Sequence, residues 1–455
     1  MDFQVLESHR LKSFHNRMTL LSAAGTFLDG FDLTVIAVAL PFLSKQWHIG
    51  AGLMGLAASS AVIGMLVGSI VLGRLTDRLG RKKLYVFDLL SFVIFAALTA
   101  FSQNVWELIA FRFLLGIGIG ADYPISSTLV AEFSSSRRRG RHVTTLGAMW
   151  FVGAMAAYVI GLVMTPLGAQ AWRYMLLFGA VLALVVILFR AAIPESPRWL
   201  AQTGQFEQAA DVLQRLTGQP VSTVGAVTAP SKWSDLFSPQ FVRRTLFVCV
   251  FWFAYDVAYY GISMYTPTIL KTFTHGGQFG ASLGAIVISF LSCLGAILGL
   301  SLVDRWGRRP LILFSFAGLT VMLVVLAFDP APSLVSLVFL FGLAVLFANM
   351  GPGVLDFVYP TELFPTGLRA SATGLGTAVS RVGAILGVSV FPQLVKTWGN
   401  APALWLFAVA SMLGLVVSVW LAPETKSKSL EELNQQSAQQ GSGSHSVSAG
   451  VGGPV

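Results

Sequence analysis

Charged residues are scarce in this chain. Only 11% of its 455 residues are Asp, Glu, Lys or Arg, whereas 55% are hydrophobic, and the mean hydropathy is +0.72. A protein that folds in water needs charge at about a quarter of its positions. The composition therefore excludes a soluble globular domain, and most of the molecular surface must face lipid.

Several other signatures are missing. The two cysteines, Cys249 and Cys293, lie in apolar runs and form no disulfide framework. The chain has no GxxxxGK[ST] loop for the phosphates of ATP. The six histidines show no metal-ligand spacing, and no nucleophile–base pair stands out. We therefore expect no enzyme activity, no cofactor and no bound metal.

What the chain does contain is long apolar segments, each near the roughly 20 residues that a helix needs to cross a bilayer. The twelve segments cover residues 18–42, 52–73, 84–102, 107–131, 142–164, 171–193, 245–271, 279–302, 310–328, 333–358, 370–396 and 401–422. They suggest a polar segment at 1–17, a first bundle at 18–193, a central loop at 194–244 and a second bundle at 245–422. Residues 423–455 are expected to form a largely disordered tail, because their composition is Ser-, Gly- and Gln-rich.

The basic residues predict how these segments cross the membrane. If both termini are cytoplasmic, 24 of the 30 Lys and Arg residues fall in cytoplasmic segments. Only Lys45, Arg173, Lys271 and Lys396 fall outside, and Arg112 and Arg381 remain within spans. This asymmetry follows the positive-inside rule, so we expect a multi-pass protein of the inner or plasma membrane. The net charge of +9 then needs no nucleic-acid partner to explain it.

Two loops of the chain repeat one another. The loop after the second span reads GRLTDRLGRKK (73–83), and the loop after the eighth reads SLVDRWGRRP (301–310). Their aspartates, Asp77 and Asp304, lie 227 residues apart, which is about half of the chain. The repeat predicts two parallel six-helix halves, an arrangement typical of transporters that work by alternating access.

The first loop resembles the signature of the Major Facilitator Superfamily. PESPRWL (194–200), YPTELFPTGLR (359–369) and PETKSKSLEE (423–432) are similar to its sugar-porter-like branch. The resemblance implies an all-α membrane protein with twelve transmembrane helices in two pseudo-symmetric six-helix bundles, with spans 1, 4, 7 and 10 lining a central cavity. It also implies a gating or structural role for loop-motif residues at the cytoplasmic side: Gly73, Asp77, Arg78, Gly80, Arg81, Glu132, Arg137, Asp304, Arg305, Arg308, Glu362 and Arg369.

Four carboxylates lie deep inside spans 1, 4 and 7: Asp29, Asp32, Asp122 and Asp256. Carboxylates in a bilayer are costly and tend to mark ion or substrate pathways. A buried carboxylate binds a proton readily, and one that alternates between charged and neutral forms could couple proton and anion binding. We expect these four residues to take part in proton coupling, together with Arg112, which matches a coupling position of the family. Asp88 and Asp356 are expected near the cytoplasmic ends of their spans, where snorkelling or a salt bridge is the default.

Three helical motifs narrow the resemblance. GADYPISSTLVAE (120–132), WFAYDVAYYG (252–261) and NMGPG (349–353) resemble the fourth, seventh and tenth helices of phosphate:proton symporters. Trp252, Asp256 and Tyr260 are spaced four residues apart, so they lie along one stripe of a helix. This resemblance implies that these three residues and Asn349 bind substrate.

Two features point to an organic anion instead. Trp150 stands where a phosphate symporter has a substrate-binding glutamine, and an indole donates only one hydrogen bond. DGFD (29–32) is similar to the first-helix motif of aromatic-acid:proton symporters. Tyr123, Trp150 and the intramembrane cation Arg381 complete the expected substrate site.

The sequence thus predicts a secondary transporter, a proton-coupled symporter for a small anion such as an organic acid, including aromatic acids, or inorganic phosphate. A carrier of a neutral, sugar-like solute or of an organic cation is the alternative, and a non-transporting nutrient sensor is a third hypothesis. The partners expected are a small-molecule substrate, protons and the lipid bilayer, and the chain is expected to be a monomer.

Overall fold

The computed structural model describes residues 6, 11–190, 193–218, 232–273, 278–329, 333–398, 400–430 and 432–433. The predicted disordered tail lies mostly outside these residues, as do most of the segment 1–17 and part of the central loop. Within the described chain the molecule is built from helices with no strand. This confirms the predicted all-α membrane fold.

The first six spans form one group of helices. Their bounds are α1 (Lys12–Trp47), α2 (Ala51–Leu79), α3 (Arg81–Phe101), α4 (Val105–Phe133), α5 (Arg139–Met164) and α6 (Ala171–Arg190), with the 3₁₀ helix η3 (Thr165–Gln170) between the last two. The central loop contributes the short helices α7 (Pro197–Gln202) and α8 (Phe206–Thr217) and the 3₁₀ helix η4 (Trp233–Phe237).

The second group follows the same order. Its helices are α9 (Val242–Phe273), α10 (Gln278–Trp306), α11 (Arg308–Phe328), α12 (Leu334–Met350), α13 (Pro352–Leu363), α14 (Thr366–Trp398) and α15 (Asn400–Leu421). Ten stretches of the described chain are apolar and long enough to cross a membrane. One of these stretches holds both α5 and α6, and α14 is not among them. Each of the twelve predicted spans nevertheless coincides with one helix or, for the tenth, with the pair α12–α13.

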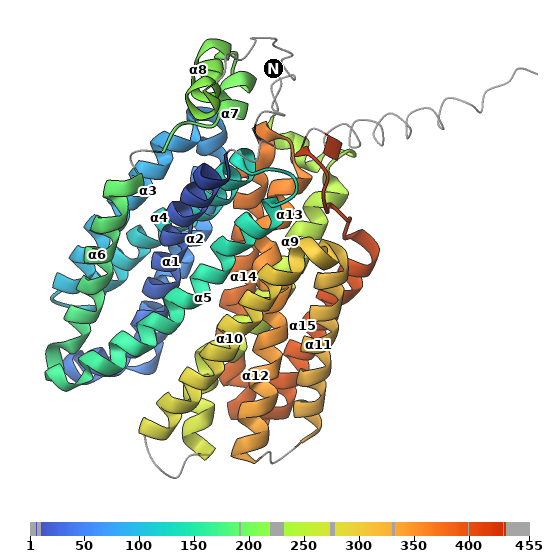
Figure 1. Ribbon diagram of the computed structural model, residues 1–455. Coiled ribbons are helices and arrows are strands. Elements are labelled where there is room, and N and C mark those ends of the chain that lie inside the picture. Colours follow the sequence, from blue (N-terminus) through green and yellow to red (C-terminus); the bar gives the residue numbers. More distant parts are fainter. Residues whose placement is uncertain are drawn as a thin grey trace, which may run out of the picture.

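The two groups repeat the same packing, and Figure 1 shows them side by side, blue to green and yellow to red. In the first, α1 packs on α5 and α6, α2 on α4, and α3 on α4 and α6. In the second, the equivalent helices α9, α10 and α11 pack in the same way on α14 and α15, on α12, and on α12 and α15. The groups meet through α2 against α14 and α5 against α10. α7 and α8 lie at one end of the assembly, here called the α7–α8 end.

The tenth span is interrupted where the sequence predicted a continuous helix over 333–358. Gly351 has non-helical torsions (φ −117°, ψ −83°) and Pro352 begins α13. Proline has no N–H to donate and its ring crowds the carbonyl four residues earlier, so the helix breaks at this point. The break places Gly353 and Asp356 on a short separate helix that faces α5 and α9.

A close approach of α2 and α4 depends on glycine, in particular within the GIGIG run at 116–120 of α4. A Cβ atom at Gly116 would lie 2.1 Å from the carbonyl oxygen of Ala61, and one at Gly64 would lie 2.1 Å from that of Phe113. Small residues allow helix backbones to approach closely in membranes, where packing replaces the hydrophobic effect as the main driving force.

We therefore expect Gly116→Ala to lower the thermal unfolding midpoint of the detergent-solubilised protein, because the added methyl group must push two backbones apart. The cost expected for such overpacking is about 1–3 kcal/mol. Gly52→Ala is the matched control, since a Cβ atom there meets nothing within 4 Å. An unchanged midpoint for Gly116→Ala would contradict the packing argument.

Candidate functional site

A small chamber lies between the two groups of helices. It has a volume of about 20 Å³ and is lined from α4, α5, α9, α13 and α14. Five predicted site residues meet there: Tyr123, Trp150, Asp256, Tyr260 and Arg381. These residues are far apart in the sequence, and the packing of the two groups against each other brings them together.

Arg381 is the cation of the chamber, and only 2% of the residue is exposed. Its Nη1 donates to the hydroxyl of Tyr260 at 2.6 Å and lies 3.4 Å from Oδ2 of Asp256. The guanidinium carbon also lies 5.3 Å from the ring centroid of Tyr123 and 5.4 Å from that of Tyr260. The contact to Asp256 is longer than a tight charge-assisted bond, and Nε of Arg381 has no partner in the described chain. The arginine therefore keeps donor capacity for a further acceptor.

Aromatic rings form most of the chamber's wall. Trp150 packs edge-to-face on Tyr260 and Tyr259, with centroids 6.5 and 6.4 Å apart. Tyr123 stacks on Phe357 at 4.9 Å. Rings of this kind can hold a planar, apolar group while the polar tips of tyrosine bind its charged end.

A second cavity lies beyond Trp150 and Tyr260, on the side away from the α7–α8 end. It has a volume of about 70 Å³ and includes Leu33, Tyr158 and Ser292 in its wall. Trp150, Phe151, Tyr259 and Tyr260 line both spaces. These rings thus separate the buried Arg381 from this second cavity, which we call the outer cavity.

Asp356 also lines the chamber, and here the sequence-based expectation was wrong. The sequence placed it near a helix end with a salt bridge, but the side chain is buried and its Oδ1 atom has no hydrogen-bond partner in the described chain. The reason is the break at Gly351, which starts a new helix and sets its register. The chamber therefore holds two carboxylates, Asp256 and Asp356, and one arginine.

Two further predicted substrate residues sit at the margin of the chamber. Asn349 accepts a 2.8 Å hydrogen bond from the hydroxyl of Tyr255, which does line the chamber. Trp252 lies against Tyr123 with ring centroids 6.5 Å apart, and its Nε1 has no partner in the described chain. Neither residue belongs to the lining itself.

The first group of helices contains its own buried cluster around Arg190. Arg190 lies 2.7 Å from Oδ1 of Asp122 and 3.4 Å from Oδ2 of Asp88, and all three side chains are at most 2% exposed. Ser126 donates to Asp122 at 2.9 Å, and the guanidinium stacks 3.8 Å from the ring of Tyr85. The sequence placed Arg190 in a cytoplasmic segment and Asp88 at a helix end, and both assignments miss this interior cluster. Arg190 and Asp88 both face inward because each compensates the buried charge of the other.

The two aspartates of the DGFD motif have different surroundings. Asp32 pairs with Arg112, with Oδ2 and Nη1 3.3 Å apart and both side chains buried. Asp29 is equally buried, but its Oδ2 has no hydrogen-bond partner in the described chain. Of these predicted proton-coupling residues, Asp32 and Arg112 thus form an ion pair, whereas Asp29 forms none with a described residue.

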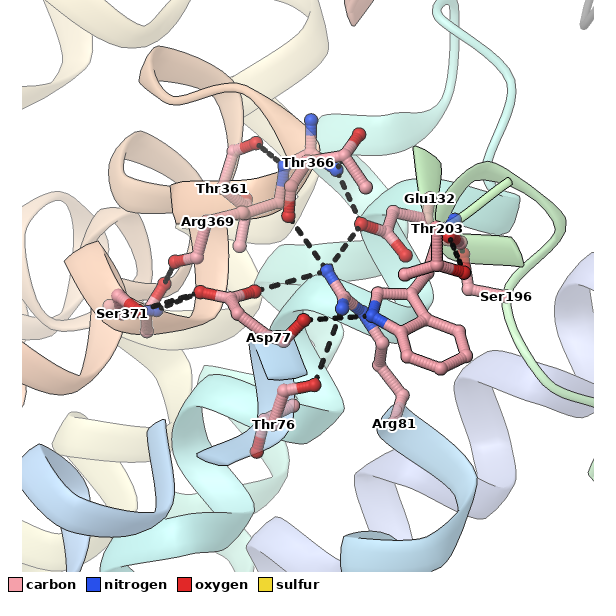
Figure 2. Close-up of polar contacts among 12 residues, drawn as sticks. Thr76, Asp77, Arg81, Glu132, Ser196, Thr203, Thr361, Thr366, Arg369 and Ser371 are labelled. Atoms are coloured by element: carbon pink, nitrogen blue, oxygen red, sulfur yellow. Dashed lines mark hydrogen bonds and ion pairs between the residues drawn. The ribbon is translucent and has the colours of Figure 1, made fainter. Parts of the chain in front are cut away.

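A network of buried ion pairs joins the two groups at the α7–α8 end, and Figure 2 shows its first half. Arg81 binds Asp77 at 3.2 Å and Glu132 at 3.1 Å, all within the first group. From the second group, Arg369 binds Glu132 at 2.7 Å, and the backbone N–H and hydroxyl of Ser371 donate to Asp77 at 2.8 and 2.7 Å.

The second half of this network repeats the first with the groups exchanged. Arg308 binds Asp304 at 3.0 Å and Glu362 at 2.9 Å. From the first group, Arg139 lies 3.8 Å from Glu362, and the backbone N–H of Arg141 donates to Asp304 at 2.9 Å. We call the two halves together the latch: Asp77, Arg81, Glu132, Arg139, Asp304, Arg308, Glu362, Arg369 and Ser371.

The loop glycines support the latch. Gly80 and Gly307 connect α2 to α3 and α10 to α11 with φ of +100° and +101°, a conformation that favours glycine. A Cβ atom at Gly73 would come within 3.0 Å of the carbonyl oxygen of Ala370, so Gly73 allows α2 to approach α14.

Three arginines of the predicted gating set stay outside the latch. Arg78, Arg137 and Arg305 are exposed, and none forms an ion pair with the described residues. The sequence analysis missed Arg139 and Ser371. When the two halves are aligned, Arg139 takes the position of Arg369 and Ser371 takes the position of Arg141, so the repeat could have identified both.

The comparisons with known proteins agree with this architecture. The family model described as sugar (and other) transporter matches residues 18–436. The inner membrane metabolite transport protein YgcS of Escherichia coli is 35% identical over 96% of this chain and 97% of its own length. The niacin transporter NiaP of Acinetobacter baylyi is 29% identical over 94% of this chain and 98% of its own.

Among solved structures, the proton:xylose symporter XylE superimposes with a TM-score of 0.79. It covers 93% of this chain and 99% of its own, at 23% sequence identity, so the likeness establishes a shared fold. The family match spans both groups of helices, the chamber and the latch. The chain therefore belongs to the sugar (and other) transporter family, and it is a Major Facilitator Superfamily transporter rather than an enzyme.

Proposed function

We propose that this transporter carries an organic acid together with protons, and that the acid's carboxylate binds Arg381. The observation that carries this proposal is the placement of Arg381: a buried arginine whose Nε has no partner in the described chain, held beside Asp256 in a chamber walled by aromatic rings. Arginine binds carboxylates through paired, charge-assisted hydrogen bonds. The rings of Tyr123, Trp150 and Tyr260 would hold the remainder of the acid.

The wall favours an aromatic acid over inorganic phosphate. Phosphate is small and makes hydrogen bonds on all sides, whereas seven of the twelve residues that line the chamber are aromatic and present flat apolar faces. A relative over nearly the whole chain, NiaP, is named as a transporter of niacin, which is an aromatic acid. The likeness to the xylose symporter concerns the fold and does not bear on the substrate.

Asp256 supplies a direct means of proton coupling. While ionised, it competes with the substrate carboxylate for Arg381, and two like charges beside one arginine repel each other. When it takes up a proton, Arg381 becomes available to the acid. Proton binding and acid binding are then linked, so an inward proton gradient would drive uptake.

The count of buried charges supports additional proton sites. Asp356 lines the same chamber as Asp256 and Arg381, and Asp29 interacts electrostatically with the cluster of Arg190, Asp88 and Asp122. Each cluster holds more carboxylates than arginines, and uncompensated charge in a low-dielectric interior is costly. We propose that some of these carboxylates hold protons at neutral pH and release them during the transport cycle.

The latch would control access from one side. It holds the α7–α8 end closed in this structure, while the outer cavity approaches the chamber from the opposite side. With both termini cytoplasmic, as the Lys and Arg distribution predicts, this state is closed toward the cytoplasm. The division into bundles 18–193 and 245–422 would let the two halves rock about the chamber in a single monomer.

A transport screen tests the proposal. Proteoliposomes receive an inward proton gradient and labelled benzoate-like acids, small dicarboxylates, phosphate or sugars. Accumulation of an aromatic acid that a protonophore abolishes is the expected result. Accumulation of a sugar or of an organic cation, with no acid carried, would favour the alternative substrates. Binding of a solute without any transport would indicate a sensor.

Arg381→Lys keeps the positive charge but loses the planar guanidinium group, which can bind a carboxylate through two parallel N–H groups. A hydrogen bond to a charged group contributes about 1.5–3 kcal/mol, so we expect acid binding to weaken by roughly tenfold to a hundredfold. Isothermal titration calorimetry with the purified protein measures the change. Arg215→Lys is the control, because Arg215 forms an exposed pair with Asp211 on α8. Unchanged affinity in Arg381→Lys would exclude Arg381 as the carboxylate site.

Asp256→Asn mimics the protonated aspartate and leaves Arg381 without its ion-pair partner at every pH. In the wild type, acid binding should strengthen as pH falls, because protonation of Asp256 releases Arg381. The variant should bind the acid tightly with little pH dependence, exchange it across the membrane, and fail to accumulate it under a proton gradient. Asp211→Asn serves as the control. Gradient-driven accumulation at the wild-type rate in Asp256→Asn would rule out this coupling.

Glu132→Gln weakens the latch, because Glu132 accepts from both Arg81 and Arg369. We expect a larger population open at the α7–α8 end, and therefore faster labelling of a cysteine placed at Gly147, which lines the chamber and lies close to α13. The background is Cys249→Ser/Cys293→Ser. Glu207→Gln on α8 is the matched control, and equal labelling rates in the two variants would mean that the latch does not hold this end closed.

A further inference from the structure

A basic pocket lies at the α7–α8 end, apart from the chamber and next to the latch at Arg141. It has a volume of about 520 Å³ and opens between the start of α1, the start of α5 and the end of α10. Its polar lining consists of Lys12, Asn16, Thr19, Arg138, Arg141, His142 and Thr145. The transport mechanism proposed above uses none of these side chains.

Three cations of this pocket have no counter-charge among the residues that the structure describes. No carboxylate of the described chain lies within ion-pair distance of the side chains of Lys12, Arg138 or Arg141. The nearby carboxylate of Asp304 is already bound by Arg308 and by the backbone N–H of Arg141. The pocket therefore presents three positive charges to whatever enters it.

The backbone adds to this preference for an anion. α1 begins at Lys12 and α5 at Arg139, and neither helix has an acidic residue in its first turn or a hydrogen bond from its N-cap side chain, although Asp304 accepts from one N–H of α5, that of Arg141. The first N–H groups of a long helix carry a partial positive charge and need acceptors. Two such helix starts, of 36 and 26 residues, meet at this pocket beside the three cations.

One wall of the pocket is apolar and faces outward. Leu20 is 65% exposed and Leu300 is half-buried, and both belong to the lining. In a membrane protein such leucines meet acyl chains, so the pocket combines a polar site for an anion with a surface for a hydrocarbon tail. A soluble anion would use only the first of these.

We propose that this pocket binds the phosphate-bearing headgroup of an anionic phospholipid from the surrounding leaflet. Lys12, Arg138 and Arg141 bind the phosphate, Asn16, Thr145 and His142 lie within the same pocket for the remaining headgroup oxygens, and the acyl chains run along Leu20 and Leu300. Basic pockets between transmembrane helices are suited to such headgroups. Because the pocket touches both groups of helices beside the Arg141–Asp304 contact, a bound lipid favours the latch-closed state.

The experiment uses the purified full-length chain in detergent and measures lipid binding by native mass spectrometry and by thermal unfolding. We expect phosphatidylglycerol to bind and to raise the unfolding midpoint more than phosphatidylcholine does. Arg138→Gln/Arg141→Gln should weaken phosphatidylglycerol binding by about tenfold or more. The control is Lys82→Gln/Lys83→Gln, which removes two exposed charges at the same end without touching the pocket.

Three results would overturn the proposal. The first is the same affinity for phosphatidylglycerol and phosphatidylcholine. The second is an equal loss in the control variant, which would mean that the lipid responds to total surface charge. The third is stabilisation by inorganic phosphate or glycerol phosphate that matches that of the lipid, since the pocket would then select a soluble anion. The unfolding midpoints of both variants without lipid verify that each is folded.

Discussion

Compensation of buried charge is the constraint on which this structure depends. An isolated charge in the interior of a membrane protein is unfavourable, and seven buried arginines of the described chain each lie within ion-pair distance of at least one carboxylate. At the α7–α8 end the compensation crosses between the two halves, with Arg369 and Arg139 reaching the carboxylates of the opposite half. In the interior, Arg112 and Arg190 pair within the first group, and Arg381 pairs in the chamber.

Carboxylates whose charge is fully compensated hold the structure together, whereas carboxylates whose charge is incompletely compensated are available for function. In the latch, paired carboxylates also accept backbone or hydroxyl hydrogen bonds, as Asp77 does from Ser371, so that end is firmly held. In the interior, Asp29 and Asp356 form no ion pair with a described residue, and Asp256 has only the 3.4 Å ion-pair contact to Arg381. Incomplete compensation leaves these groups able to bind a proton, and it leaves Arg381 able to bind a second anion.

The sequence predicted the fold well because the signals are local and repeated. Apolar runs predicted the twelve spans, and the loops around Asp77 and Asp304 predicted two related halves. It placed Tyr123, Trp150, Asp256, Tyr260 and Arg381 in one site, and the structure brings them together. It missed Asp356 because a helix break at Gly351 changes which way that residue faces, and it missed the partnership of Arg190 with Asp88 because a pair of distant charges leaves no pattern along the chain.

The central claim is that a substrate carboxylate replaces ionised Asp256 at Arg381, so binding of the acid must take up a proton. Calorimetric titration of the acid in two buffers with different ionisation enthalpies measures this directly. We predict an uptake of about one proton per bound acid in the wild type at neutral pH and none in Asp256→Asn. Binding without proton uptake in the wild type would contradict the account.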